Sequence, residues 1–259
     1  MSLERFLFMT NSPQTCIQSR KSRRHGRDFI IQSTRRLAAQ ASGIFAVLFV
    51  LITALVWPGV TKSFDLSITK AVVAHRNGFL NTVAPLISTI GGTKIVLAFS
   101  LICLGLLAWR KHWLQAKILF GALAGDVIIV TAFKRMISRM RPDKQFWLGS
   151  VEDQQSFPSG HSANNTVLWF MLAIIVSTLA RTEVQRAWAR ALNILAVLMP
   201  LFIGLSRIYV AHHWTTDVLS GWSLGIAWVA FVTWIYFGEL AKLHAQASQH
   251  QAPQHKERK

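Results

Sequence analysis

Three short polar segments interrupt an otherwise apolar sequence, and their residue types are those that handle phosphate. They span 134–142 (KRMISRMRP), 158–161 (PSGH) and 206–217 (SRIYVAHHWTTD). Phosphoryl transfer requires fixed positive charge for the phosphate oxygens, a nucleophile, and a proton donor for the leaving oxygen. The three segments supply all of these. The candidate residues are Lys134, Arg141, Ser159, Gly160, His161, Arg207, His213 and Asp217.

The cations and the backbone amides among these candidates suit phosphate binding. The planar guanidinium groups of Arg141 and Arg207 can bind phosphate oxygens with two parallel hydrogen bonds. Lys134 adds a third positive charge. The amides of Ser159 and Gly160, at the start of a predicted helix, would form an anion-binding helix N-terminus. We therefore expect these five residues to hold the phosphate.

The histidines supply the nucleophile and the acid. His213 and Asp217 are four residues apart, and on a helix this spacing places both side chains on one face. The carboxylate can then accept a hydrogen bond from one ring nitrogen while the other points at phosphorus. His213 is thus the predicted nucleophile, oriented by Asp217. His161 is predicted to protonate the leaving alcohol.

The sequence contains no dense cluster of Asp, Glu, His and Cys around these candidates. Because the three cations already supply the charge that a magnesium or zinc ion would supply, we expect no metal and no other cofactor. The two cysteines, Cys16 and Cys103, form no metal-binding pair, since one lies in a basic stretch and the other in an apolar run.

The elements that must position these residues are predicted membrane helices. Of the 259 residues, 52% are hydrophobic and only 15% are charged, which is too apolar for an ordinary soluble domain. Runs of about 20 apolar residues cross a bilayer as helices. The predicted fold is all-α, a polytopic membrane protein with six transmembrane helices. They cover 37–58, 89–109, 115–136, 162–180, 191–206 extended by 208–210, and 218–238.

The order of these helices brings the three polar segments to one side of the membrane. The first segment ends the third helix, the second begins the fourth, and the last joins the fifth to the sixth. We therefore expect a single active site at the outer membrane–water interface. Between the first two helices, in 63–85, apolar residues interleave with Asp65, Lys70 and Arg76. This pattern predicts an amphipathic helix that lies along the interface.

The distribution of charge indicates the orientation. The formal net charge is +17, from 28 Lys and Arg against 11 Asp and Glu. With both termini in the cytoplasm, most of the 28 cations would face the cytoplasm, as the positive-inside rule requires. Because the cations are spread over loops and tails, no nucleic acid is expected as a partner. We predict a basic cytoplasmic segment 1–36, a transmembrane domain 37–239 and a polar cytoplasmic tail 240–259.

Several of these residues also have a simpler interpretation. A lone basic residue at a helix end commonly reaches toward the interface, so only the combination of Lys134, Arg141 and Arg207 indicates a site. His212 lacks an acidic partner four residues on and is expected to be an interfacial histidine. Asp126, inside the third helix, is expected to make a helix–helix hydrogen bond rather than to catalyse.

The three segments resemble the signature motifs of the type-2 phosphatidic acid phosphatase superfamily, which also contains the vanadium haloperoxidases. These motifs are K-x6-RP, PSGH and SR-x5-H-x3-D, and all three match in order over 134–217. Three spaced motifs at matching helix ends are much more specific than PSGH alone. The resemblance implies that His213 forms a phosphohistidine that water hydrolyses, with His161 as the acid and Asp217 orienting His213. It implies phosphate binding by Lys134, Arg141, Ser159, Gly160 and Arg207.

The resulting expectation is a lipid phosphate phosphatase of a bacterial inner membrane, with its site facing the periplasm or exterior. Undecaprenyl diphosphate, phosphatidylglycerophosphate, phosphatidic acid and lipid A stay open as substrates, and so does the oligomeric state. One alternative is a phosphotransferase that passes the phosphate to a second lipid. Others are a non-catalytic lipid-binding or transport protein, and a haloperoxidase, which six spanning helices disfavour.

Overall fold

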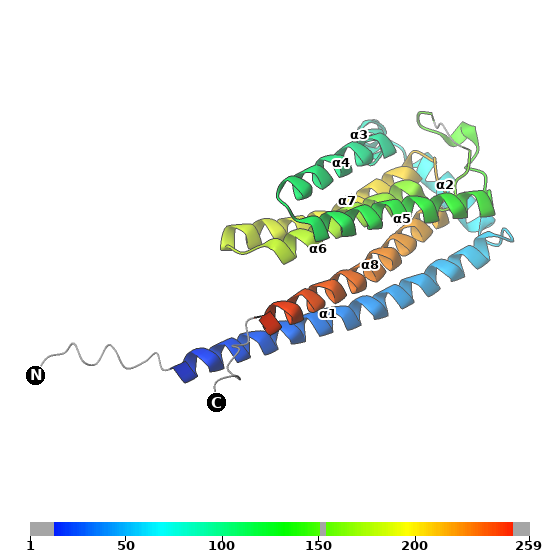
Figure 1. Ribbon diagram of the computed structural model, residues 1–259. Helices are drawn as coiled ribbons and strands as arrows, with labels where there is room; N and C mark the ends of the chain where they lie inside the picture. Colours follow the sequence, from blue (N-terminus) through cyan, green and yellow to red (C-terminus); the bar gives the residue numbers. More distant parts are fainter. Residues whose placement is uncertain (1–12, 151–153, 251–259) are drawn as a thin grey trace, which may run out of the picture. The chain divides into compact units, whose positions relative to one another are not determined.

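The computed structural model (Figure 1) describes residues 13–150 and 154–250. Within these ranges the chain is helical and contains no strand, apart from an isolated bridge between Met140 and Gln155. The predicted all-α fold is confirmed. In chain order the helices are α1 (Pro13–Val56), α2 (Lys62–Ala74), α3 (Gly78–Ile90), α4 (Thr93–Trp109), α5 (Trp113–Ile137), the short 3-10 helix η2 (Lys144–Phe146), α6 (Gly160–Leu179), α7 (Glu183–Tyr209) and α8 (Thr215–His250).

Five helices in the described part of the chain are long and apolar enough to cross a membrane. They are Asp28–Val56 of α1, Trp113–Ile137, Gly160–Leu179, Glu183–Tyr209, and Thr215–Ala247 of α8. Helices α3 and α4 meet the same criterion only as a pair that is bent by 45° at the break between them. With this pair counted as one span, the six predicted spans correspond to α1, the α3–α4 pair, α5, α6, α7 and α8.

The bend between α3 and α4 is built on two glycines. A Cβ on Gly91 would lie 2.4 Å from Cγ2 of Ile203 in α7, and a Cβ on Gly92 would lie 2.8 Å from the carbonyl oxygen of Thr89. A side chain at either position would force its neighbours to move, so glycine allows this close approach. The predicted second span, 89–109, is consequently broken at its start, and the break lies against α7.

The predicted amphipathic segment 63–85 forms two helices rather than one. Helix α2 ends at Ala74, and α3 begins at Gly78 after Asn77, whose Oδ1 accepts a hydrogen bond from the Leu80 amide at 2.9 Å. The buried residues of α2 are polar, namely Asp65 and Thr69. The helical character is as predicted, but the polar face of α2 points into the protein.

The chain divides into two compact units. One unit comprises Met1–Ala39 and Trp234–Lys259, in which the Arg35 guanidinium lies 5.2 Å from the centroid of the Trp234 ring. The other unit, Gln40–Thr233, contains the remaining helices and all candidate residues. Helix α1 is continuous through residue 36, where the sequence predicts a domain boundary.

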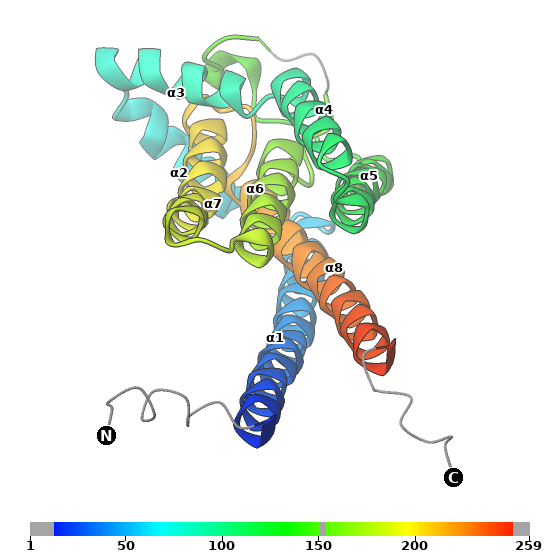
Figure 2. The ribbon, with the colours of Figure 1, turned by 60° about the vertical axis from the view of Figure 1, so that its left-hand side comes forward.

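Within the unit Gln40–Thr233, α6 packs against both α5 and α7 (Figure 2). The α5–α6 contact is a core of large apolar side chains, since Leu119 on α5 and Val167, Met171 and Ile175 on α6 are all buried. Burial of this kind fixes the rotation of α6 about its own axis. The residues at the start of α6 are thereby held in a defined orientation.

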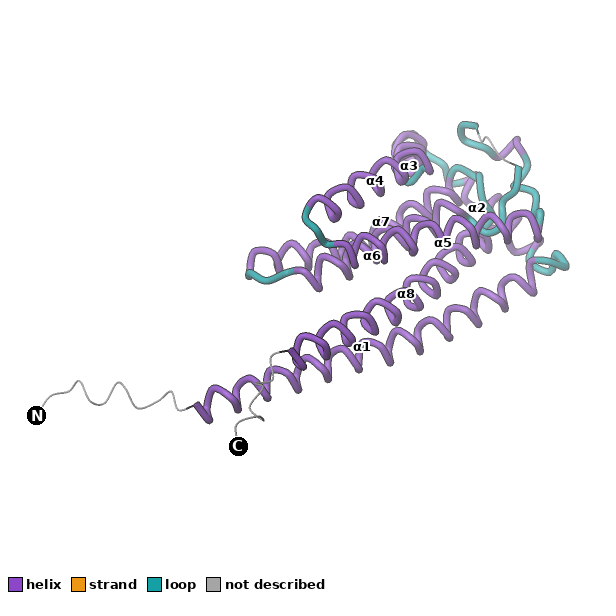
Figure 3. The backbone as a smooth tube through the Cα atoms, in the orientation of Figure 1, coloured by secondary structure: helices purple, strands orange, loops and turns teal. Residues whose placement is uncertain are grey.

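Helix α8 approaches the start of α6 closely through two glycines. A Cβ on Gly221 would lie 2.6 Å from the carbonyl oxygen of Ser159, and a Cβ on Gly225 would lie 2.8 Å from Cβ of Thr166. This contact allows the Ser159 amide to donate to the Asp217 carbonyl oxygen at 3.0 Å. The loops that follow α5 and α7 lie at the same end of this unit (Figure 3), so the three polar segments converge as predicted.

Candidate active site

The chain leaves α5 through a left-handed residue and then runs alongside the segment that precedes α6. Ser138, which follows α5, has φ of 47°. The Ser156 amide donates to the Arg139 carbonyl oxygen at 2.8 Å, and Met140 bridges Gln155. This antiparallel pairing places Arg139 and Arg141 beside the segment 158–161.

Ser159 begins α6 as its N-cap. Its Oγ accepts hydrogen bonds from the amide of Ser162 at 3.4 Å and from Ser162 Oγ at 3.0 Å, which satisfies a donor that the helix itself leaves unpaired. Gly160 and His161 follow in the first turn of the helix. The predicted helix N-terminus is therefore present.

The connection between α7 and α8 is a tight turn that places His213 before α8. The amides of His212 and His213 both donate to the Arg207 carbonyl oxygen, at 3.1 and 3.3 Å, and Ala211 has φ of 55°. Because α8 begins only at Thr215, the predicted placement of His213 and Asp217 on one helix face is wrong.

The two side chains nevertheless meet, because Asp217 caps its own helix. Its Oδ2 reaches back from the first turn of α8 and accepts a hydrogen bond from the Trp214 amide at 2.9 Å. This is the backward reach of an acidic residue in the first turn of a helix. The same oxygen lies 3.6 Å from Nδ1 of His213, which is a close approach but longer than a hydrogen bond.

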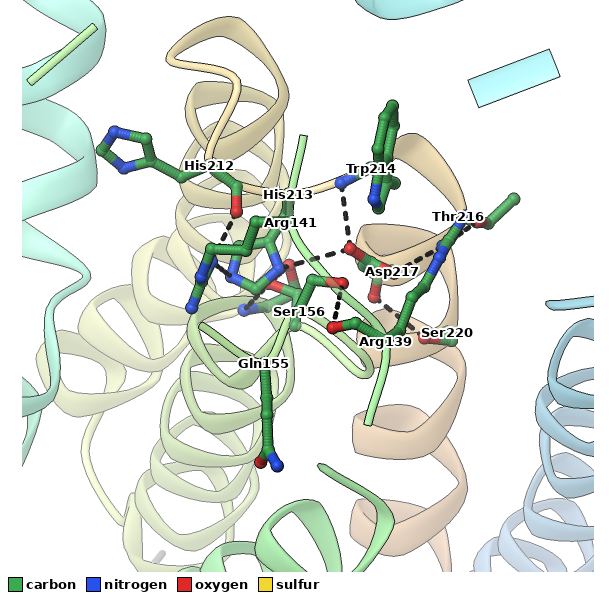
Figure 4. A network of polar contacts seen from close by, with 12 residues as sticks. Arg139, Arg141, Gln155, Ser156, His212, His213, Trp214, Thr216, Asp217 and Ser220 are labelled. Atoms are coloured by element: carbon green, nitrogen blue, oxygen red, sulfur yellow. Dashed lines mark hydrogen bonds and ion pairs between the residues drawn. The ribbon is translucent and has the colours of Figure 1, made fainter. Parts of the chain in front are cut away.

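The His213 ring is held between an arginine and a carboxylate (Figure 4). Nη1 of Arg141 lies 3.0 Å from Nε2 of His213, on the side of the ring opposite Asp217. Arg141 also donates to the His212 carbonyl oxygen. The His213 side chain is 1% exposed, so its two nitrogens have different and fixed surroundings.

Burial lowers the pKa of His213 well below its usual value of 6.5, and the positive charges of Arg141, Arg207 and Lys134 lower it further. The ring is therefore neutral near neutral pH. A neutral imidazole keeps an electron pair on one nitrogen, which is the requirement for a nucleophile.

The other two cations reach into the same region from α5 and α7. Nζ of Lys134 donates to the carbonyl oxygen of Gln155 at 2.6 Å, and Nη1 of Arg207 donates to Oγ of Ser88 at 2.6 Å. Arg207 is 5% exposed. A buried guanidinium and a lysine ammonium here supply the positive charge that a phosphate group requires.

His161 lies within electrostatic reach of Arg207, Arg141 and Lys134. A Cβ on Gly92 would lie 3.9 Å from its Nε2, so the break between α3 and α4 faces this ring. The structure thus brings all eight candidate residues to one end of the unit Gln40–Thr233. Their catalytic and binding roles stay predictions.

Sequence reasoning missed three residues that contact this cluster. Arg139, inside the first motif, donates to Asp217 Oδ1 at 2.6 Å and to Asp65 Oδ2 at 2.7 Å. Thr216 donates to Asp65 through its amide at 3.0 Å and its hydroxyl at 2.7 Å. The available signal was Asp65 itself, one of few acids in a strongly basic chain.

One further polar residue, Asp126, behaves as expected. With its amide nitrogen turned toward α5, Asn164 donates to Asp126 Oδ2 at 2.8 Å and to the Gly160 carbonyl oxygen at 3.1 Å. This is the helix–helix hydrogen bond expected for Asp126. The His212 ring points away from His213 (Figure 4) and lies edge-on to Trp147, at a centroid distance of 5.8 Å.

The described ranges 13–150 and 154–250 contain no group of three or more His, Cys, Asp or Glu side chains placed to hold a metal ion. The residues around His213 are mainly nitrogen cations, which repel a metal ion and attract a phosphate. Independence from metal stays a prediction that only an assay can test.

The chain is similar in sequence to known phosphatases. Residues 115–240 match the model of the PAP2 superfamily. The chain is 32% identical to phosphatidylglycerophosphatase B of Bacillus subtilis over 69% of its own length and 86% of the relative. It is 25% identical to an undecaprenyl-diphosphatase of Sulfolobus acidocaldarius over 66% of its length and 77% of that protein.

One solved structure is also similar. The crystal structure of a transmembrane PAP2-type phosphatidylglycerolphosphate phosphatase from Bacillus subtilis aligns with a TM-score of 0.68 and 28% identity. The alignment covers 78% of this chain and 96% of the solved one. The arrangement of helices described above is therefore that of a known membrane phosphatase fold.

Proposed function

This chain belongs to the PAP2 superfamily, and from that membership and the geometry around His213 we propose that it hydrolyses the terminal phosphate of a membrane lipid. The observation that carries the proposal is the buried His213 ring, held between the Arg141 guanidinium at its Nε2 and the Asp217 carboxylate at its Nδ1. This arrangement supports Nε2 as the nucleophile, with Arg141 beside it as a proposed phosphate-binding cation.

The proposed reaction has two steps. In the first, Nε2 of His213 forms a bond to phosphorus, the bond from phosphorus to the lipid oxygen breaks, and His161 gives its proton to that oxygen. In the second, water attacks the phosphohistidine, His161 takes the proton from that water, and the nitrogen–phosphorus bond breaks. The products are the lipid alcohol, or the lipid monophosphate from a diphosphate, and inorganic phosphate.

Charge stabilisation in both steps is assigned to protein cations. Lys134, Arg141 and Arg207 would bind the phosphate oxygens, together with the amides of Ser159 and Gly160 at the start of α6. Asp217 would stabilise the positive charge that develops on the His213 ring as its Nε2 becomes bonded to phosphorus. This set needs no metal ion, so we propose hydrolysis without a cofactor.

The names of the relatives rank the candidate substrates. Phosphatidylglycerophosphate and undecaprenyl diphosphate come first, because the two relatives are named for these substrates. Each alignment includes most of the relative's length, 86% and 77%. Phosphatidic acid and lipid A follow from the motifs alone. All four present a phosphate on an apolar anchor, which suits a site at the end of a bundle of apolar helices.

We also propose the location and organisation of the chain. The chain would lie in a bacterial cytoplasmic membrane with both termini in the cytoplasm and the site facing the periplasm or exterior, as the positive-inside rule supports. Segment 1–36 would be a basic cytoplasmic extension, 37–239 the phosphatase domain and 240–259 a cytoplasmic tail. Parts of the first and last segments lie outside the described residues.

The test is phosphate release by the detergent-purified protein and by His213→Ala, in excess EDTA, from each of the four lipids. We expect release by the parent protein and loss of release in the variant. A requirement for added divalent metal would overturn the cofactor-free mechanism. Transfer of the phosphate to a second lipid, with little free phosphate, would instead identify a phosphotransferase, and no turnover of any lipid would contradict the proposed function.

A further inference from the structure

Arg139 is clamped between two buried carboxylates from distant parts of the chain. Its Nη1 lies 2.6 Å from Oδ1 of Asp217 and its Nη2 lies 2.7 Å from Oδ2 of Asp65. Both carboxylates are 0% exposed, and the Arg139 side chain is 12% exposed. The guanidinium also lies 5.5 Å from the centroid of the Trp214 ring. Its position is thus fixed on three sides.

Asp65 is held as firmly as Arg139. Its Oδ1 accepts from the Thr216 amide at 3.0 Å, and its Oδ2 accepts from the Thr216 hydroxyl at 2.7 Å. Arg139 Nη1 donates in turn to the Thr216 hydroxyl at 2.8 Å. Helix α2 is thereby joined to the first turn of α8, where Asp217 lies.

These contacts determine how Asp217 presents itself to His213. Oδ1 of Asp217 is taken by Arg139, so the carboxylate cannot rotate about its axis without losing a charge-assisted hydrogen bond. Oδ2 is left for the Trp214 amide and for the His213 ring (Figure 4).

We propose that Arg139 and Asp65 are positioning residues for the reaction: they hold Asp217 ionised and oriented toward Nδ1 of His213. The inference rests on the proposed function. Neither residue is among those assigned to phosphate binding. They act through Asp217, whose charge stabilises the His213 ring while the nitrogen–phosphorus bond forms and the bond to the lipid oxygen breaks.

A purely structural role for this cluster is the competing explanation. Joining helices by burying two carboxylates with one arginine is energetically poor, because the cost of removing charges from water often exceeds their attraction, and apolar side chains would pack as well. Arg139 contacts Asp217 directly, and Asp65 contacts Arg139. The geometry therefore favours a role in the chemical step.

The test compares Arg139→Gln, Arg139→Lys and Asp65→Asn with the parent protein and with Thr69→Val, a matched control on the same buried face of α2. We expect kcat per folded enzyme to fall about 10- to 100-fold in Arg139→Gln and Asp65→Asn with KM nearly unchanged, since supporting residues typically contribute on that order. Arg139→Lys keeps the charge but not the two-pronged contact, so it should rescue part of the loss. Thr69→Val should retain the parent kcat.

The dependence of kcat on pH distinguishes a positioning role of Arg139 from a purely structural one. Arg139→Gln leaves two buried carboxylates without their cation, so the acid side of its kcat profile should move to higher pH. If the role were purely structural, the variants would have a lower melting temperature but the same kcat per folded enzyme and the same pH profile as the parent. That result would overturn the inference. If the parent itself releases no phosphate, the proposed function fails; if the parent is active, His213→Ala is inactive and these variants match the parent, only the positioning role fails.

Discussion

At the scale of single residues, the site depends on giving the two nitrogens of His213 different neighbours. Arg141 occupies the side of Nε2 and Asp217 the side of Nδ1. A phosphate bound by Arg141 would lie directly in front of Nε2, the proposed nucleophile. We expect the planar shape of the Arg141 guanidinium to matter for phosphate binding as much as its charge does.

Replacement of Arg141 by lysine tests that statement. Arg141→Lys keeps the positive charge but cannot reach phosphate, His213 and the His212 carbonyl in one plane, so kcat/KM should fall about 10- to 100-fold. Arg135→Lys, an exposed position in the last turn of α5, is the matched control and should behave as the parent. Initial rates of phosphate release measure both, and equal rates for the two variants would show that charge alone matters.

The buried histidines predict how stability depends on pH. Burial, followed by the charges of Arg207 and Arg141, lowers the pKa of His212 to about 3, and the pKa of His213 is also lowered. Between about pH 6.5 and about 3 the unfolded chain therefore binds more protons than the folded one, so folding loses stability as pH falls through that window. The melting temperature in detergent should drop from pH 7 to pH 4.5, and less steeply for His212→Gln. Parallel slopes for the two proteins would refute the assignment.

At the scale of elements, the close contact of α8 with the start of α6 positions both the predicted acid and the predicted orienting carboxylate. Gly221 allows the contact, because a Cβ there would lie 2.6 Å from a backbone oxygen that cannot move independently. The Ser159 amide and the Asp217 carbonyl oxygen meet across the same contact. A small separation of these helices would therefore move His161 and Asp217 relative to each other.

Substitution of this glycine should disrupt structure and activity together. We expect Gly221→Ala to lower stability by about 1–3 kcal/mol, as overpacking of a tight contact does, and to lower activity strongly. Gly121→Ala on α5 is the control, since a Cβ at Gly121 meets nothing within 4 Å; it should be neutral or slightly stabilising. Thermal melting and phosphate release report the two effects, and full activity in Gly221→Ala would show that the helices can separate without harm.

At the scale of the whole molecule, the question is which face of the membrane carries the site. The loop after α5, which contains Ser150, is on the site side of the bundle. Glu183 is the first residue of α7 and follows the turn that joins α6 to α7 at their other ends. The proposed orientation places the first loop outside and the second inside. These two positions therefore report opposite faces.

Labelling of single cysteines in intact cells decides the orientation. In a background with Cys16→Ser and Cys103→Ser, an impermeant thiol reagent should label Ser150→Cys but label Glu183→Cys only after the cells are permeabilised. The opposite pattern would invert the orientation while leaving the chemistry of the site unaffected.

The sequence by itself indicated the apolar helices and the eight candidate residues, but not every helix boundary. Apolar runs long enough to span a bilayer are a local property of the chain, and helix order then brings the polar segments to one end, so Lys134, His161 and Arg207 could be grouped without coordinates. The spacing of His213 and Asp217 indicated that they meet. It did not indicate how, because the start of α8 depends on the cap that Asp217 makes with the Trp214 amide.

Only the tertiary structure showed which residues contact Asp217 and hold it in place. Asp65 is separated by 74 positions from Arg139 and by 151 from Thr216, and nothing in the local pattern of α2 distinguishes a buried acid from a solvated one. Whether a carboxylate in an amphipathic helix faces water or a guanidinium depends on which helices pack around it. For Asp65 the partners are Arg139, which follows α5, and Thr216 in the first turn of α8, and both reach it only once the helices have packed.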